Sequence, residues 1–230
     1  MTKDIEPIYK ALLNEIISLK LKPGARLKEE EVSVKYGVSR TPIRDVFKRL
    51  ELNGLLEVYP QCGTFVTRID LGMMSSLMYV RASTEFVTLL SLFKTITPGD
   101  IAQIRMLLEN QKTALEKGFD SPEFPDEFFK ADNEFHTELY KKAGKEDALK
   151  LLNESFPYYS RYRYLTFLRD KHEIEELYKR HSQIVDVLEE KNEAKLYEVC
   201  MEHNFSGLHG IKSVQERHPD YFVEGGKEKA

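Results

Sequence analysis

Four polar side chains of types that bind metal ions fall on otherwise apolar helical stripes in the second half of the chain. Asp132 and His136 are four residues apart, so on a helix they share one face, which also carries phenylalanines. His181 and His203 each stand among apolar residues at helical spacing. One carboxylate and three imidazoles suit a divalent cation that keeps coordination positions open for water or a ligand.

The two later histidines are placed symmetrically about Asn192, where we expect a turn: His181 lies 11 residues before it and His203 lies 11 residues after it. In an antiparallel helix pair both imidazoles would stand about 16 Å from that turn, at 1.5 Å per residue. The residues alone leave two interpretations open. A histidine on an apolar stripe is commonly a hydrogen-bonded core residue, and the alternative is a metal ligand.

A second pattern with a chemical meaning lies near the N-terminus, where Arg40, Arg44 and Lys48 recur every four residues. On a helix they form one basic ridge, and apolar residues fill the opposite side. The helix opens on Ser39 or Thr41, whose hydroxyls suit a helix start. Because a short helix and a tight turn precede it, the pattern predicts a helix-turn-helix that reads DNA. The alternative is an ordinary solvated basic face.

The elements that must position this ridge occupy residues 1–69. Apolar spacing predicts a helix over 5–19 and a second one over 27–36, before the helix with the basic ridge. Two short strands, 55–59 and 63–67, then face each other across a turn. Three helices followed by a β-hairpin predict a winged helix-turn-helix domain.

The histidine-bearing part, residues 73–222, follows a linker at 70–72 and reads as helical throughout, with breaks at glycine, proline and asparagine. The expected helices are 73–95, 98–117, 124–143, 146–157, 158–168, 171–190 and 193–216. The sequence therefore predicts a mainly α protein, with an N-terminal winged helix-turn-helix, a C-terminal bundle of six or seven helices and a flexible tail at 223–230.

Charge divides the chain in the same way. Residues 1–69 carry 12 Lys and Arg against 9 Asp and Glu, whereas residues 70–230 carry 22 against 29. This favours a DNA-facing first domain and an acidic remainder with other duties. The two cysteines, Cys62 and Cys200, fit no metal or redox spacing, and no apolar run is long enough for a membrane span. We expect a soluble cytoplasmic protein.

The run from Leu21 to Val66 resembles the GntR family of bacterial transcription regulators, on the motifs VSRTPIR and RLELNGL and a glycine in the wing. The resemblance implies that Arg40 and Arg44 contact the operator. It also implies roles near the phosphates or at the wing tip for Ser39, Thr41, Lys48 and Gly63. Two positions depart from the commoner pattern: Glu30 stands where some members have a DNA-contacting arginine, and Cys62 precedes the wing glycine.

The remainder of the chain resembles the all-helical effector-binding domain, of the FCD type, found in the FadR subgroup of that family. The matching pieces are Asp132-x-x-Phe135-His136, His181-x-x-Ile184 and the closing His203, and Lys145 departs from the pattern. The resemblance implies a divalent metal ion, Zn²⁺ or Ni²⁺, held by Asp132, His136, His181 and His203.

Effectors of similar proteins are small organic acids, so cationic groups of the bundle are candidates for binding one. Arg81 precedes Glu85 by one helical turn, which resembles the family's Arg-x-x-x-Glu, although a structural ion pair with Glu85 is an equal alternative. Arg161 and Arg163 lie in a segment rich in tyrosine and are the other candidates for the effector site.

The sequence thus predicts a ligand-responsive regulator, a repressor rather than an enzyme, that binds a palindromic DNA operator as a homodimer. A bound acid would favour a dimer geometry that misplaces the reading helices. Two alternatives remain open: a metalloenzyme with a DNA-binding module, and a direct metal sensor. No additional carboxylate or histidine is placed as a general base, which weighs against the enzyme.

Overall fold

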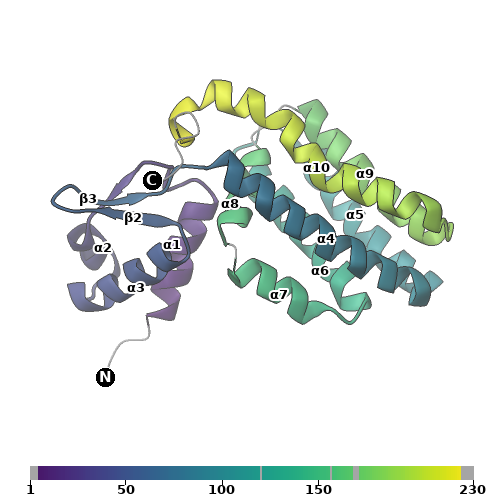
Figure 1. Ribbon diagram of the computed structural model, residues 1–230, viewed down its shortest axis with the longest axis horizontal. Coiled ribbons are helices and arrows are strands. Elements are labelled where there is room, and N and C mark those ends of the chain that lie inside the picture. The colour runs from purple at the N-terminus through teal and green to yellow at the C-terminus, as the bar shows by residue number, and fades with distance from the viewer. Residues whose placement is uncertain (1–4, 120, 156, 168–170, 224–230) are drawn as a thin grey trace.

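The computed structural model describes residues 5–119, 121–155, 157–167 and 171–223, which form a small winged body beside a longer all-helical one (Figure 1). Within these residues there are ten α-helices and one three-stranded sheet, and the sheet follows the N-terminal helices. The predicted fold class is therefore confirmed.

The winged body is built from short elements in the predicted order. Its helices are α1 (Glu6–Ile17), α2 (Glu29–Tyr36) and α3 (Arg40–Leu52), and its strands are β1 (Arg26–Leu27), β2 (Leu56–Tyr59) and β3 (Gly63–Val66). The strands pair antiparallel in the order β1-β3-β2, so β3 is central. The two-residue strand β1 was not expected from the sequence, because two residues carry no alternating pattern.

The turn between α2 and α3 depends on Gly37, which ends α2 with a φ of 61°. Glycine adopts this left-handed conformation without steric cost. Ser39 then enters α3 in an extended conformation. One face of α3 is buried in the core of the winged body through Ile43, Val46, Phe47 and Leu50. The opposite face is therefore left for solvent.

The all-helical body contains seven helices, and each observed end lies within two residues of the expected one. They are α4 (Leu71–Thr95), α5 (Pro98–Lys117), α6 (Phe124–Lys142), α7 (Glu146–Ser155), α8 (Pro157–Thr166), α9 (Lys171–Glu189) and α10 (Glu193–Arg217), and the 3₁₀ turn η1 (Pro219–Tyr221) follows. The segment expected as a linker contains the start of α4, where Asp70 caps the helix by accepting from the Gly72 amide at 2.8 Å. Of the expected tail, residues 224–230 lie outside the described residues.

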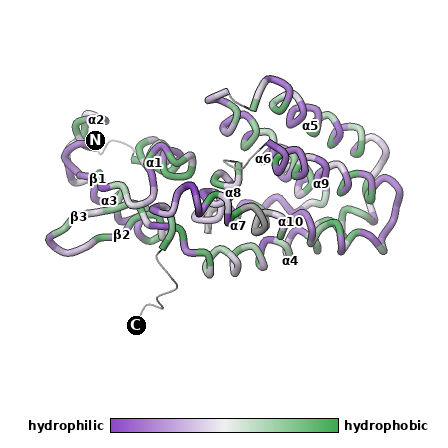
Figure 2. The backbone as a smooth tube through the Cα atoms, turned by 90° about the horizontal axis from the view of Figure 1, so that it is seen from above, coloured by the Kyte–Doolittle hydropathy of each residue, from purple (hydrophilic) through white to green (hydrophobic). Residues whose placement is uncertain are grey.

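Amphipathic helices build the bundle. Hydrophobic and hydrophilic residues alternate along most helices in Figure 2, as helices with one buried face require. The largest apolar cluster joins α4, α5, α6, α9 and α10 and includes Leu92, Ile104, Leu139, Ile184 and Leu196. The helix α8 differs, because Pro157 and every residue from Arg161 to Thr166 are buried.

Three connections join the two bodies near the start of α4. Helix α8 packs against α1, and it lies between the winged body and the bundle in Figure 1. Arg161 of α8 donates to the Thr67 carbonyl at 2.8 Å. The chain end returns to the same place, where the Ile69 amide donates to the Tyr221 carbonyl at 2.8 Å and Ile69 bridges Phe222 in parallel. The segment 67–70 is therefore held from two sides.

Candidate functional site

The three histidines singled out in the sequence meet in the middle of the bundle. His136 lies on α6, His181 on α9 and His203 on α10, and all three are buried. Their ring centroids are 4.6–5.2 Å apart, and one nitrogen of each ring lies within 4.8 Å of the other two. Helices distant in sequence thus bring three imidazoles to one point, and His181 and His203 stand side by side on α9 and α10.

Asp132 completes the group, one turn before His136 on α6. Its Oδ1 lies 3.4 Å from His181 Nε2 and 3.8 Å from His136 Nε2. Its Oδ2 accepts a hydrogen bond from Arg163 Nη2. Burial alone would raise the pKa of Asp132, but the charge of Arg163 and the neighbouring histidines outweigh it and hold that pKa well below its usual range. Asp132 is therefore a carboxylate at neutral pH.

Gln111 of α5 determines which ring nitrogen of His181 carries the hydrogen. The sequence alone did not point to this residue. Its Oε1 lies 2.7 Å from His181 Nδ1, so Nδ1 carries the proton and Nε2 keeps its lone pair. Within the described part of the chain, His181 Nε2 has no hydrogen-bond partner, although it is buried and faces the Asp132 carboxylate. Two electron-rich atoms that face each other in this way are stabilised by a cation between them.

His181 and His203 are suited to donate lone pairs rather than to carry protons. Burial lowers the pKa of His203 to about 4, and burial also lowers the pKa of His181 well below its usual value. A neutral imidazole is the metal-binding form. The donor set, the unsatisfied nitrogen of His181 and the nearby carboxylate therefore fit a divalent ion, and the triad is a candidate metal site.

A second carboxylate, Glu85 of α4, also belongs to this group. It is fully buried, with Oε2 at 3.1 Å from His136 Nδ1 and Oε1 at 3.5 Å from His203 Nε2. Burial would raise the pKa of Glu85, but His136 and Arg81 keep it lowered well below its usual value. The sequence indicated only the pair with Arg81, whose Nε donates to Glu85 at 3.0 Å, and not the contact with the histidines.

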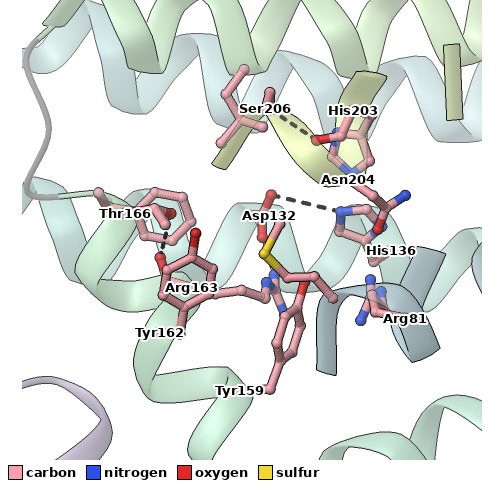
Figure 3. Close-up of a pocket in the computed structure, with 13 residues that line it drawn as sticks. Arg81, Asp132, His136, Tyr159, Tyr162, Arg163, Thr166, His203, Asn204 and Ser206 are labelled. Atoms are coloured by element: carbon pink, nitrogen blue, oxygen red, sulfur yellow. Dashed lines mark hydrogen bonds and ion pairs between the residues drawn. The ribbon is translucent and has the colours of Figure 1, made fainter. Parts of the chain in front are cut away.

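A cavity of about 50 Å³ adjoins the cluster (Figure 3). It is lined by Asp132, His136 and His203, and by two of the three arginines proposed for the effector, Arg81 and Arg163. This volume has room for a few water molecules. Both guanidinium groups are engaged, since Arg81 pairs with Glu85 and Arg163 donates to Asp132 and Asn133.

The third arginine, Arg161, does not line this cavity. Residues two apart on a helix differ by about 200° in direction, so Arg161 and Arg163 leave α8 on opposite sides. Arg161 is buried against the winged body, where Nη1 donates to the Thr67 carbonyl at 2.8 Å and the guanidinium stacks over Tyr158. Burial lowers the pKa of Arg161 to about 10. Its observed position is the junction between the two bodies rather than the pocket.

The predicted DNA-reading residues lie on the surface of the winged body. The side chains of Arg40, Arg44 and Lys48 are exposed along α3, and Ser39 and Thr41 are exposed at its start. Sequence analysis missed two acidic partners from α2. Glu30 Oε2 lies 2.8 Å from Arg40 Nη2, and Glu29 Oε2 accepts from Arg44 Nε at 2.9 Å.

Gly63 stands at the start of β3, directly after the turn of the wing. Its φ is 121°, and a side chain there would begin 2.9 Å from Arg26 Nε. Glycine at this position therefore lets the exposed guanidinium of Arg26, on β1, lie against the wing. Arg26 is a basic group beside the wing tip that sequence analysis did not single out.

A winged helix-turn-helix joined to a helical domain with a polar pocket defines a ligand-responsive class of transcriptional regulators. Comparison with family descriptions places residues 5–66 in "Bacterial regulatory proteins, gntR family" and residues 77–205 in the FCD domain. The chain belongs to the GntR family of DNA-binding transcriptional regulators and carries an FCD domain.

Proteins of similar sequence are described as HTH-type transcriptional regulators. The chain is 26% identical over 219 residues to the HTH-type transcriptional repressor RspR of Escherichia coli, covering 95% of this chain and 93% of that protein. It is 24% identical over 208 residues to the uncharacterized HTH-type transcriptional regulator YdhC of Bacillus subtilis, covering 90% and 91%. These relatives and families are transcriptional regulators rather than enzymes, as the sequence predicted.

Solved structures share the fold. McbR/YncC of E. coli superposes with a TM-score of 0.71 at 20% identity, over 95% of this chain and 100% of that one. The Listeria monocytogenes regulator Lar superposes with a TM-score of 0.60 at 16% identity, over 92% and 98%. None of the helices in the described ranges is long and apolar enough to span a membrane.

The geometry of the histidine cluster leads to a prediction about the metal content of the protein. We expect the purified protein to bind about one divalent ion per chain, and His181→Ala to lose it. We expect Gln111→Leu to weaken binding about 10- to 100-fold, because the ring of His181 loses the partner that fixes its tautomer. Elemental analysis and titration with Zn²⁺ and Ni²⁺ measure both. The control is His172→Ala, since His172 is exposed on the same helix; an ion retained by His181→Ala would place the metal elsewhere.

Proposed function

We propose that the protein is a repressor that releases its operator when a small organic acid binds beside a divalent ion, Zn²⁺ or Ni²⁺, in the helical domain. The observation that carries this proposal is that Arg81 and Arg163 line the same cavity as Asp132, His136 and His203. A bound ion would supply open coordination positions for a carboxylate oxygen. The name of RspR, a transcriptional repressor, supports repression.

The effector would act by competing for the guanidinium of Arg163. In the structure this group is paired with Asp132 and Asn133, and the cavity has room only for a few waters. A carboxylate that enters must displace those waters and offer Arg163 a new bidentate partner. Such an exchange would shift α8, because Arg163 ties that helix to α6.

Helix α8 connects the pocket with the DNA-binding domain. Arg163 faces the cavity, while Arg161 on the opposite side holds the Thr67 carbonyl and hydroxyl at 2.8 and 3.1 Å. Tyr158, on the same side as Arg161, accepts from the Asp70 amide at the start of α4. A rotation of α8 would therefore reorient the winged body. The effector would stabilise the orientation that does not fit the operator.

Operator release tests this function. DNA selected from a random library by the protein gives the operator, and a panel of small organic acids is then added with and without chelator. We expect one acid to weaken operator binding by about 5- to 150-fold, a coupling of about 1–3 kcal/mol. Arg163→Met should remove this response, because the acid loses its guanidinium partner, whereas Lys179→Met, which removes an exposed cation on α9, should keep it.

Other outcomes contradict the proposal in distinguishable ways. If chelation alone abolishes or restores DNA binding and no acid has an effect, the protein is a metal sensor. If the random library yields no preferred sequence, the reading role of α3 is wrong.

The junction makes a separate prediction. In Arg161→Met the side chain stays unbranched and apolar along its stem but cannot bond Thr67, so we expect most of the acid-dependent change in operator affinity to disappear. Metal content and acid affinity, measured by calorimetry without DNA, should stay within about twofold, because Arg161 does not line the cavity. Arg217→Met, which removes an exposed arginine of α10, is the control. An unchanged response in Arg161→Met would exclude α8 as the connection.

We also propose a homodimer that packs through α4 and reads a palindromic operator. Met73, Val80 and Val87 are spaced by seven residues on this helix and are 54%, 41% and 59% exposed, and Tyr79 beside them is 69% exposed. Apolar residues at a period of seven form the seam between two packed helices. Two reading helices on one palindrome require a twofold axis, which a pair of α4 helices can supply.

The proposed dimer interface is tested by placing negative charges on the exposed face of α4. We expect Val80→Glu with Val87→Glu to give a folded monomer in sedimentation and to weaken operator binding, because each monomer holds a single half-site. Met106→Glu is the matched control, since Met106 is 70% exposed on α5 and stands apart from α4. A dimer that survives the double change on α4 would contradict this interface.

A further inference from the structure

Helix α3 does not present Arg40 and Arg44 in the same way, because the acidic first turn of α2 holds each by a different nitrogen. Glu29 Oε2 accepts from Arg44 Nε at 2.9 Å. Glu30 Oε2 lies 2.8 Å from Arg40 Nη2, one of the two terminal nitrogens. Each carboxylate therefore leaves a different part of its partner guanidinium available for DNA.

Bidentate recognition of guanine uses a fork of guanidinium N–H groups against O6 and N7. In Arg44 the terminal pair Nη1 and Nη2 is left for this contact, since within the described residues neither nitrogen has a protein partner. In Arg40 one terminal nitrogen is already engaged by Glu30. The pair Glu29–Arg44 is thus compatible with guanine recognition, whereas the pair Glu30–Arg40 competes with it.

Fold stability does not account for the Glu29–Arg44 pair. Its side chains are 34% and 65% exposed, and exposed ion pairs add little to stability. The position of Glu29 in the first turn of α2 suits the helix dipole, but that holds equally for Glu30 and Glu31. What distinguishes Glu29 is that it accepts a hydrogen bond from Nε of Arg44, an arginine expected to contact DNA bases.

We propose that Glu29 is a positioning residue for DNA sequence recognition, which holds the guanidinium of Arg44 with its terminal fork directed at guanine. The inference rests on the proposed role of Arg44 as a base-reading residue. Binding to operator keeps the Glu29–Arg44 bond, so little side-chain freedom is lost there. Binding to a phosphate of unrelated DNA requires Arg44 to turn away and break that bond. Glu29 therefore raises the ratio of specific to non-specific affinity.

The test compares a duplex selected from a random library by the wild-type protein with a duplex of the same composition in scrambled order. In Glu29→Ala we expect affinity for the selected duplex to fall about tenfold, which lies within the roughly 5- to 150-fold that one well-formed arginine–guanine contact is worth. Affinity for the scrambled duplex should stay the same or rise. Its salt dependence should steepen by about one unit of log K per log salt, because Arg44 becomes free for a phosphate.

The matched control is Glu31→Ala. Glu31 lies in the same turn of α2 and carries the same charge, but it pairs with Lys28 at 2.6 Å rather than with a reading arginine. A general effect of acidity near DNA would change Glu29→Ala and Glu31→Ala alike. In Glu30→Ala we expect the opposite sign from Glu29→Ala, with tighter binding to the selected duplex, because a terminal nitrogen of Arg40 is released.

A double-mutant cycle separates failure of this inference from failure of the proposed function. If Glu29 acts through Arg44, then Glu29→Ala in an Arg44→Ala background has no further effect on specificity, and both single variants relax the same guanine position in a repeated selection. If Arg44→Ala keeps the wild-type specificity, the reading role of Arg44 is wrong. If Arg44→Ala relaxes specificity while Glu29→Ala behaves like Glu31→Ala, only the positioning role of Glu29 is overturned.

Discussion

The ion pair of Asp132 with Arg163 inside an apolar bundle is the interaction on which the helical domain depends. A buried carboxylate needs a cation, because removal of one partner leaves an uncompensated charge that strongly destabilises the fold. His181 does not supply that cation as a proton, since burial lowers the pKa of its imidazole well below its usual value. Asp132 can therefore be satisfied by the guanidinium, by a divalent ion or by both.

The same pocket has a second connection to the DNA-binding domain. His203 lies in the middle of α10, and the chain continues from α10 through η1 to Phe222, which bridges Ile69. Helix α8 holds Thr67 through Arg161, two residues earlier in the same segment. Two helices that contribute residues to the pocket, α8 and α10, are thus connected to residues 67–69, the segment that leads from the wing into α4. A change at the histidines that moves either helix would therefore reach this short segment.

Local periodicity explains how much of this the sequence could predict. Asp132 and His136 share a face because they are four residues apart, and the symmetric spacing of His181 and His203 places them at one depth. The direction in which the Arg161 side chain points could not be predicted in the same way. Residues 161–166 of α8 are all buried, so the helix shows no apolar stripe. The contacts of Glu85 with His136 and of Gln111 with His181 join different helices, so no spacing along one helix reveals them.

The arginines of the pocket and of the DNA-reading surface are both held by the protein's own carboxylates. Arg163 and Arg81 pair with Asp132 and Glu85 in the pocket, and Arg40 and Arg44 of α3 pair with residues of α2. An anionic ligand, whether organic acid or DNA, must therefore match or replace a carboxylate that is already in place. This arrangement sacrifices affinity for anions in general and favours ligands with the correct fork geometry. Selectivity in both sites then rests on geometry rather than on accumulated positive charge.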